Sequence, residues 1–278
     1  PRFDQNILIY SGITETKFSF GEFLDIKVNL KNLGGKIKWN YRFNNYFKLK
    51  LGSETQLGKL KYYLSVPYIP REGENNTKVL EKENLEIKNT EDYLIQSAFL
   101  ELAIIPFKQL ILIPGFRYDY FSIINNNQND PRFNFLYELE EDLRIKGGIG
   151  RYQQIAELNE LKNNPKLKPY RSTHTTLGIE KSFEYISADI VIFYKLLDRW
   201  IVRDLKDRNK LNNEGKGRVY GAELLARYDF PEHSLKGWLA YSYQRSFRID
   251  HPGEEERTFD NDQPHNLTTV GQIKLSRA

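Results

Sequence analysis

A single histidine near the C-terminal end is the first candidate for chemistry in this chain. His265 follows a run of acidic and amide side chains, FDNDQP, and precedes an alternating segment that ends near Ser276. A zinc site there would need distant carboxylates as ligands, because no histidine lies close by and the chain has 0 Cys. A catalytic histidine would need an oriented nucleophile, and no nucleophile elbow, phosphate-binding loop or zinc motif accompanies this one. We expect no metal site and no enzyme. Instead, we expect the end of a loop and the start of a strand at Asp262, Gln263, His265 and Asn266.

Composition excludes other classes of function. The absence of cysteine excludes disulfide frameworks and thiolate sites, and no cofactor motif is visible. The formal net charge of +4, from 41 basic and 37 acidic residues, is too balanced to indicate a nucleic-acid partner. The longest apolar stretch, from Leu100 to Phe116, is interrupted by Pro106 and Lys108, so we expect no transmembrane helix.

The elements that must position any site are strands. Aromatic residues make up 14% of the chain, with 18 Tyr, and glycine and proline occur at frequent intervals. No clear linker divides the sequence, so residues 1–278 are expected to form one all-β domain.

Alternation of apolar and polar residues supports the strands. The stretch from Ser19 to Lys31 places Phe20, Leu24, Ile26, Val28 and Leu30 on one face. The stretch from Ser234 to Ile249 does the same with Leu235, Leu239, Tyr241, Tyr243, Phe247 and Ile249. In the stretch from Gly217 to Phe230, Tyr220, Ala222, Leu224, Ala226, Tyr228 and Phe230 share one face. A soluble sandwich would bury such faces between two sheets, whereas a membrane barrel turns them to lipid.

Strand and connection lengths favour the barrel. The expected strands have about 9 to 17 residues, whereas about 5 to 6 is usual in globular proteins. From residue 91 onward, tight and long connections alternate, as in an up-and-down barrel with short periplasmic turns and long external loops. Tight turns are expected near Gly34–Gly35, Asn44–Asn45, Pro106, Glu140–Glu141, Tyr185–Ile186 and Pro231–His233. Long loops are expected at Arg71–Glu91, Ile123–Asp130, Gln153–Thr173, Asp204–Lys216 and Asp250–Pro264. Tyr46 to Val66 is expected as one strand with an irregularity near Gly52–Gly58, which gives about 13 strands in all.

Six stretches resemble consecutive pieces of a TonB-dependent receptor barrel, in the same order. They are PGFRYDYFS from Pro114, PRFNFLYEL from Pro131, GGIGRYQQ from Gly147, NPKLKPYRSTHTTLGIE from Asn164, YGAELLARY from Tyr220 and DNDQPHNL from Asp260. The resemblance covers about Glu91 to Ala278, and earlier residues fit only as generic barrel strands. It implies an antiparallel transmembrane β-barrel of ~22 strands around an N-terminal plug. The plug and the C-terminal strands are therefore expected outside this sequence.

Two groups of candidate site residues follow from this architecture. The polar face of the strands is expected to form a wall of charged side chains that lines the lumen and holds the plug. Its expected members are Arg117, Asp119, Glu180, Asp189, Glu223, Arg227 and Arg248. External loops are the expected place for ligand contacts through charge and aromatic stacking. The expected contacts are Tyr152, Gln153, Gln154, Lys166, Lys168, Tyr170 and Arg171.

The resemblance implies an outer-membrane receptor of a Gram-negative bacterium. Such a receptor takes up a scarce ligand, such as a ferric siderophore or cobalamin, with energy from a TonB-type protein that contacts the plug. The alternative is a structural or docking component of an outer-membrane complex that transports nothing. Expected partners are outer-membrane lipid, the small-molecule ligand, the TonB-type protein and other envelope proteins, with no nucleic acid.

Overall fold

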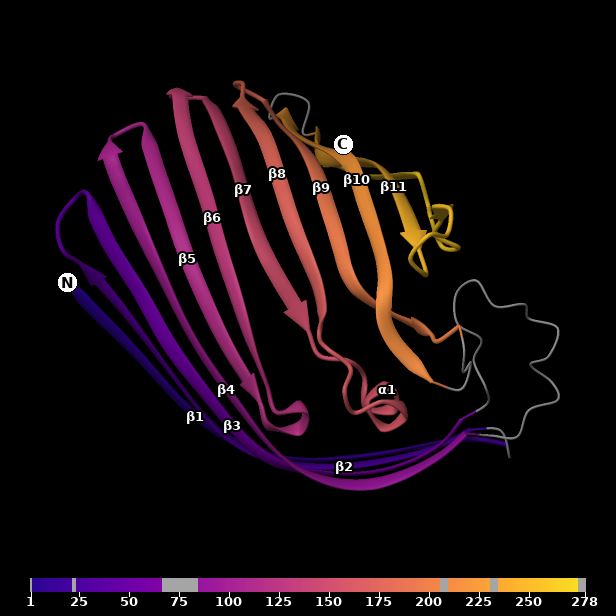
Figure 1. The fold of residues 1–278 in the computed structure, drawn as a ribbon. Helices are drawn as coiled ribbons and strands as arrows, with labels where there is room; N and C mark the ends of the chain where they lie inside the picture. Colours follow the sequence, from indigo (N-terminus) through magenta and orange to yellow (C-terminus); the bar gives the residue numbers. More distant parts are fainter. Residues whose placement is uncertain (1, 22–23, 67–84, 206–209, 231–234, 275–278) are drawn as a thin grey trace.

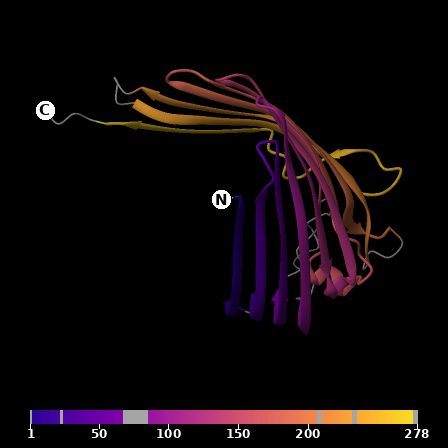
Figure 2. The same ribbon diagram turned by 90° about the vertical axis from the view of Figure 1, so that its left-hand side faces the viewer.

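A computed structural model describes residues 2–21, 24–66, 85–205, 210–230 and 235–274. It consists of one antiparallel sheet of 13 strands that curves into an open trough (Figures 1 and 2). Neighbours in sequence are neighbours in the sheet from β1 to β12, and β13 pairs with β11. The strands are β1 (Phe3–Phe20), β2 (Leu24–Arg42), β3 (Phe47–Val66), β4 (Leu85–Phe107), β5 (Leu110–Phe121), β6 (Asn126–Glu140), β7 (Leu143–Gln154), β8 (Tyr170–Ser182), β9 (Ile186–Arg203), β10 (Leu211–Phe230), β11 (Leu235–Ile249), β12 (Arg257–Thr258) and β13 (His265–Ile273).

The expected all-β meander of about 13 strands is confirmed, and the sheet is not closed within this chain. Within the described residues, helix is confined to the 3₁₀ turn η2 (Ser122–Ile124) and the six-residue helix α1 (Leu158–Asn163). No helix in the described ranges is long and apolar enough to cross a membrane. The tight connections expected beside Asn44, Pro106, Glu140 and Tyr185 lie between successive strands. The turn expected at 231–233 lies outside the described residues.

Several expected boundaries were wrong. Gly34 and Gly35 lie inside β2, where Gly34 leaves room for the ring of Tyr10 on the neighbouring strand. The stretch from Ser19 to Lys31 is not one strand, because β1 ends at Phe20 and Gly21 turns with a φ of 55°. The single strand β3 is confirmed, but its pairing is continuous through Gly52 and Gly58, so the expected irregularity is absent there.

The long loops are shorter than expected because pairing continues into polar segments. β4 already begins at Leu85, β6 at Asn126, β8 at Tyr170 and β10 at Leu211. Of the loop expected at 71–91, residues 71–84 lie outside the described residues. Backbone hydrogen bonds to the neighbouring strand stabilise an extended chain whether or not the side chains are apolar.

Register defines two faces of the sheet. We call the face that carries Tyr170 the inner face, because the Tyr170 hydroxyl donates to Glu160 of α1 and α1 lies inside the curve (Figure 1). The opposite, outer face exposes large apolar side chains on consecutive strands. They include Leu33, Leu57, Leu100, Phe116, Phe133, Ile149, Leu177, Ile192, Leu196 and Leu267. This apolar outer face begins at the short turns and covers about ten residues of each strand, the length that a tilted strand needs to cross a bilayer.

Aromatic rings border the apolar outer face at both ends. Near the short turns, Tyr41 packs on Phe43 with centroids 4.7 Å apart, and Tyr228 lies 6.2 Å from Phe230. Toward the long-loop end, Tyr194 stacks on Tyr220 at 6.4 Å. Two such aromatic rows are typical of the two interfaces of a membrane-spanning barrel.

The first four strands exchange their apolar face halfway along. Leu33, Leu57 and Leu94 pair in register as the last apolar row on the outer face. Beyond it the outer face becomes polar on β2 to β4, where the first polar row is Lys31, Lys59 and Asp92. In the same row β1 still carries Ile13, and its outer face becomes polar from Glu15 onward. On the inner face of the same segment, Ile26, Leu64 and Ile87 pair in register, and Ile87 is buried. The apolar set from Phe20 to Leu30, expected to face lipid in a barrel, therefore lies on the inner face.

Water explains this exchange. Residues 24–31 extend β2 by roughly 25 Å beyond the apolar outer face, at ~3.3 Å per residue. The outer side chains of that extension are solvated, and Lys27 Nζ donates to Asp25 at 2.6 Å. This hydrogen bond holds the pKa of Asp25 below its usual value. We call the part of the strands with the apolar outer face the apolar zone. Outside this zone, a polar outer face and an apolar inner face are the stable arrangement.

Candidate functional site

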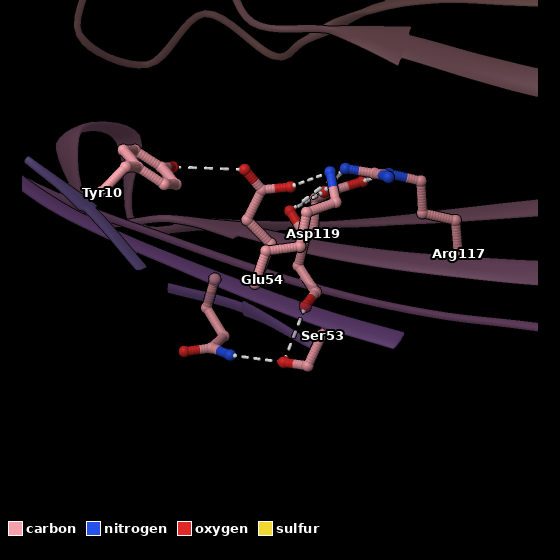
Figure 3. A network of polar contacts seen from close by, with 8 residues as sticks. Tyr10, Ser53, Glu54, Arg117 and Asp119 are labelled. Atoms are coloured by element: carbon pink, nitrogen blue, oxygen red, sulfur yellow. Dashed lines mark hydrogen bonds and ion pairs between the residues drawn. The ribbon is translucent and has the colours of Figure 1, made fainter. Parts of the chain in front are cut away.

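The polar inner wall of the trough is the candidate functional site. Its charges come from alternate residues of successive strands, so the period of two places them all on one face. The wall begins on β1 to β3, where Glu54 Oε2 lies 2.8 Å from Lys36 Nζ and Glu54 Oε1 accepts from the Tyr10 hydroxyl at 3.3 Å. Figure 3 shows Tyr10, Glu54 and Arg117 on one side of the strands and Ser53 on the other.

A buried carboxylate anchors the next part of the wall. Asp119 is only 5% exposed and accepts two hydrogen bonds from Arg117, from Nε and Nη2, each at 2.7 Å. The Ser97 hydroxyl also donates to Asp119, and Arg117 Nη2 donates to that hydroxyl at 3.1 Å. A bidentate guanidinium pair with a third hydrogen bond fixes all three side chains and leaves none free to rotate.

A lysine bridges two carboxylates farther along the wall. Lys146 on β7 lies 2.6 Å from Asp189 on β9 and 3.4 Å from Glu180 on β8. Glu180 also lies 3.6 Å from Arg144. Apart from the Arg117–Asp119 pair, which lies within β5 and has a buried carboxylate, the wall is a chain of partly exposed ion pairs between strands, each worth ~0 to 1 kcal/mol.

Two hollows in the inner wall differ in charge. The first, of about 380 Å³, is bordered by five cationic and two acidic side chains. These are Lys36, Lys38, Lys50, Arg117 and Arg132 with Glu54 and Glu101. The second, of about 370 Å³, is bordered by Asp189 and Glu223 without a cation. The first hollow therefore has more cationic than acidic side chains on its border, whereas the second has Glu223 and the Asp189 that pairs with Lys146.

All seven residues expected in the lumen wall lie on the inner face. Register aligns Glu180 with Asp189, Glu223 with Ser242 and Arg227 with Trp238. Arg248 is 4% exposed and lies between two rings, 3.7 Å from the centroid of Trp200 and 4.2 Å from that of Phe259. Their contact with a plug stays a prediction. Sequence reasoning missed Tyr10, Lys36, Glu54 and Lys146. Lys36 shares the parity of the apolar residues Leu24 to Leu30, so the alternation in that part of β2 pointed away from it.

The seven residues expected to bind ligand do not form one cluster. Tyr152 lies on the inner face, 4.5 Å below the guanidinium of Arg132 and 4.7 Å from the ring of His174. Arg171 follows Tyr170, which lies on the inner face, so Arg171 points to the outer face. There it pairs with Asp198 at 2.8 Å. Gln153 donates to Asp130 at 3.0 Å, and Gln154 pairs in register with Tyr170 at the end of β7.

Lys166, Lys168 and Tyr170 belong to a small packed platform at the long-loop end. Its buried core consists of Ala156, Leu161, Leu167, Ile201 and Leu211, so it joins the β7–β8 connection to the ends of β9 and β10. Asn213 Oδ1 accepts from the backbone of Lys168 at 2.7 Å, and Asn164 Oδ1 accepts from that of Lys166 at 3.0 Å. Tyr170 packs on Trp200 with centroids 5.1 Å apart. Ligand binding by these residues stays a prediction.

The segment around His265 forms the start of β13. Asp262 accepts from the backbone of Ser246 and from Arg245 Nε, both at 2.9 Å, and so ties the loop to β11. His265 Nδ1 lies 2.8 Å from the Tyr241 hydroxyl on the outer face, whereas Asn266 lies opposite Ser242 on the inner face. Gln263 lies between Asp262 and His265, in the loop before β13. The described ranges hold no group of three side chains suited to a metal ion.

Comparisons with known proteins agree with this geometry. A family model described as TonB dependent receptor-like, beta-barrel, matches residues 4–275. No curated protein matches the chain. A chain of the FpvAI–pyocin S2 complex superimposes with a TM-score of 0.69 at 10% identity, covering 99% of this chain and 42% of that one. The ferric enterobactin receptor PfeA of Pseudomonas aeruginosa gives a TM-score of 0.62 at 19% identity, covering 88% and 44%.

A third solved structure shows the same fold. The FrpB iron transporter of Neisseria meningitidis gives a TM-score of 0.62 at 14% identity, covering 82% of this chain and 37% of that one. The chain thus spans less than half the length of each of these three structures. Identities this low establish the fold alone.

Proposed function

This chain belongs to the TonB-dependent receptor β-barrel family, and we propose that it is part of an outer-membrane receptor that imports a scarce small molecule. The proposed ligand class is a metal chelate such as a ferric siderophore, or cobalamin, and the proposed energy source is a TonB-type protein acting through a plug. Members of this family are receptors and transporters, and two structural neighbours are an iron transporter and a ferric enterobactin receptor. We therefore also propose that the chain catalyses no reaction.

The observation that carries the proposal is the division between the two faces. The outer face is apolar over about ten residues per strand, as contact with lipid requires. The inner face carries ion pairs and two hollows bordered by charged side chains, as a water-filled lumen allows. A soluble sheet of this size would have to cover the apolar face with another layer.

Growth of a deletion strain tests the proposal. We expect loss of the full-length gene to abolish growth on one limiting source among ferric chelates, copper and cobalamin, and the wild-type gene to restore it. Restoration should fail when the TonB-type protein of the same strain is deleted. Normal growth of the deletion strain on every limiting source would contradict import.

Docking without transport is the alternative. Lys168, Tyr170 and Arg171, which were expected to bind ligand, are already engaged by contacts within the chain. This favours docking over the binding of a small ligand at these residues. One structural neighbour was also solved in complex with a protein, pyocin S2. An assembly defect of an envelope complex without any nutrient phenotype would support this alternative over import.

A further inference from the structure

Three arginines from three consecutive strands lie near a single carboxylate beyond the apolar outer face, where the charges of Asp198, Arg171 and Arg151 all act on Arg199. Arg171 on β8 lies opposite Asp198 on β9, and their side chains pair at 2.8 Å. Arg151 on β7 lies opposite Thr173, two residues from Arg171, so both arginines lie on the outer face. Arg199 follows Asp198 directly.

Arg199 occupies an irregular position in β9. Its φ of 57° is rare for a residue other than glycine, and pairing with β10 shifts register between Gly215 and Gly217 at this point. The bulge turns Trp200 inward, where it stacks on Tyr170 and Arg248. A strained backbone persists only where surrounding contacts enforce it.

The charge around Arg199 is not balanced within the described residues. Burial and the neighbouring positive charges of Arg171 and Arg151 lower the pKa of Arg199, against the opposing effect of Asp198. Neither Arg151 nor Arg199 has a carboxylate within ion-pair distance in the described part of the chain. Three guanidinium groups thus share one carboxylate, a deficit of negative charge that a multivalent anion satisfies.

The position of the cluster identifies the source of that anion. Ile149 and Leu196, the apolar outer residues next to the cluster on β7 and β9, are 51% and 50% exposed. Beside them Tyr194 and Tyr220 stack, and Tyr220 continues to Phe247 at 6.0 Å. Aromatic rows of this kind lie at the headgroup level of a bilayer, so the arginines lie where lipid phosphates lie.

We propose that Arg151, Arg171 and Arg199 bind the phosphate of a lipid headgroup in the surface leaflet of the surrounding membrane. The proposal rests on the membrane orientation in the proposed function. Planar guanidinium groups bind phosphate oxygens in pairs, and Leu196 and Tyr194 lie where the acyl chains would begin. Lipid held in this way fixes the depth of β7 to β9 in the bilayer.

Titration of the full-length protein in mild detergent tests the site. The probes are dihexanoyl phosphatidic acid, dihexanoyl phosphatidylcholine and inorganic phosphate, with binding followed by calorimetry. The test variant is Arg151→Gln/Arg199→Asn, which leaves the Arg171–Asp198 pair intact and places at position 199 a residue that tolerates positive φ. The control Lys48→Gln/Lys108→Gln removes the same charge near the short turns, from two exposed residues.

We expect phosphatidic acid to bind the wild type and the control equally and the test variant about tenfold or more weakly. Equal binding to the test variant, or no binding to the wild type, would overturn the proposal. Equal affinity for inorganic phosphate would indicate a soluble anion site and overturn the lipid assignment. The titration measures binding and not uptake. A failure of the import proposal would therefore leave the binding result valid, and a failure to bind lipid would leave the import proposal valid.

Discussion

Single side chains set the energetics of the inner wall, and Asp119 is the most sensitive of them. Alanine at position 119 would remove both hydrogen bonds of Arg117 and leave Ser97 without its acceptor. Because the Arg117 side chain stays 37% exposed, water compensates part of the loss. We expect Asp119→Ala to lower the free energy of unfolding of the refolded full-length protein by about 1 to 3 kcal/mol in urea.

Glu223→Ala is the matched control, because Glu223 lies on the same wall and has no ion pair within the described residues. It should change the free energy of unfolding by less than about 0.5 kcal/mol. Equal costs for the two variants would show that the Asp119 contacts add no stability.

Gly34 offers a second test with its neighbour as control. A Cβ at Gly34 would lie 2.3 Å from the ring of Tyr10, whereas a Cβ at Gly35 meets nothing closer than 4.0 Å. Gly34→Ala would push Tyr10 away from Glu54 and should cost about 1 to 3 kcal/mol of unfolding free energy. Gly35→Ala should cost far less, and the opposite order in a urea titration would show that Tyr10 does not pack there.

At the scale of elements, the strands were predictable and their ends were not. The period of two placed the residues named from β10 and β11 on the correct faces, because it was read from stretches that pair with each other in one continuous register. The same rule assigned Leu24 to Leu30 to the wrong face. Alternation shows which residues share a face, but it does not show where along the strand the contact with lipid ends. Gly34 and Gly35 were mistaken for a turn because glycine beneath an aromatic ring and glycine in a turn look alike in sequence.

The candidate site was predictable to the same extent. Parity placed the seven wall residues on one face, although it could not show which carboxylate each cation meets. The platform of α1, β9 and β10 was not predictable, because Ile201 and Leu211 are buried by contacts far apart in the chain. The bulge at Arg199 had no signal in sequence either, since nothing about an arginine indicates positive φ.

The face exchange in β2 predicts a labelling pattern. Asn29 and Ile37 lie on the same face of one strand, but only Ile37 lies in the apolar zone. The chain contains 0 Cys, so Asn29→Cys and Ile37→Cys each provide one labelling site within it. Any cysteine elsewhere in the full-length protein is replaced first. In the membrane-inserted full-length protein, a water-soluble maleimide should label position 29 and spare position 37. Labelling of both positions, or of position 37 alone, would place the end of the apolar zone elsewhere.

At the scale of the whole molecule, the two faces must differ in their tolerance of charge. Leu239 and Tyr241 lie on the outer face, and Trp238, Ser242 and Gln244 lie on the inner face. Leu239→Arg should cost ~2 to 4 kcal/mol of unfolding free energy in bilayers, and Ser242→Arg much less. Refolding into vesicles, followed by urea titration, measures both, and equal costs would contradict the assignment of the outer face to lipid.

The face exchange also bears on how the barrel enters a membrane. In an outer-membrane receptor of the proposed kind, the charged outer rows of β1 to β4 would have to cross the hydrocarbon layer before the apolar rows reach it. These rows carry Lys17, Lys27, Lys31, Lys59, Lys61 and Lys88. At ~2 to 4 kcal/mol for each lysine at the midplane, their joint passage costs about as much as, or more than, the whole stability of a typical domain. For such a receptor we expect unassisted insertion through an intact bilayer to be slow, and insertion to be faster where the bilayer is locally thinned or opened.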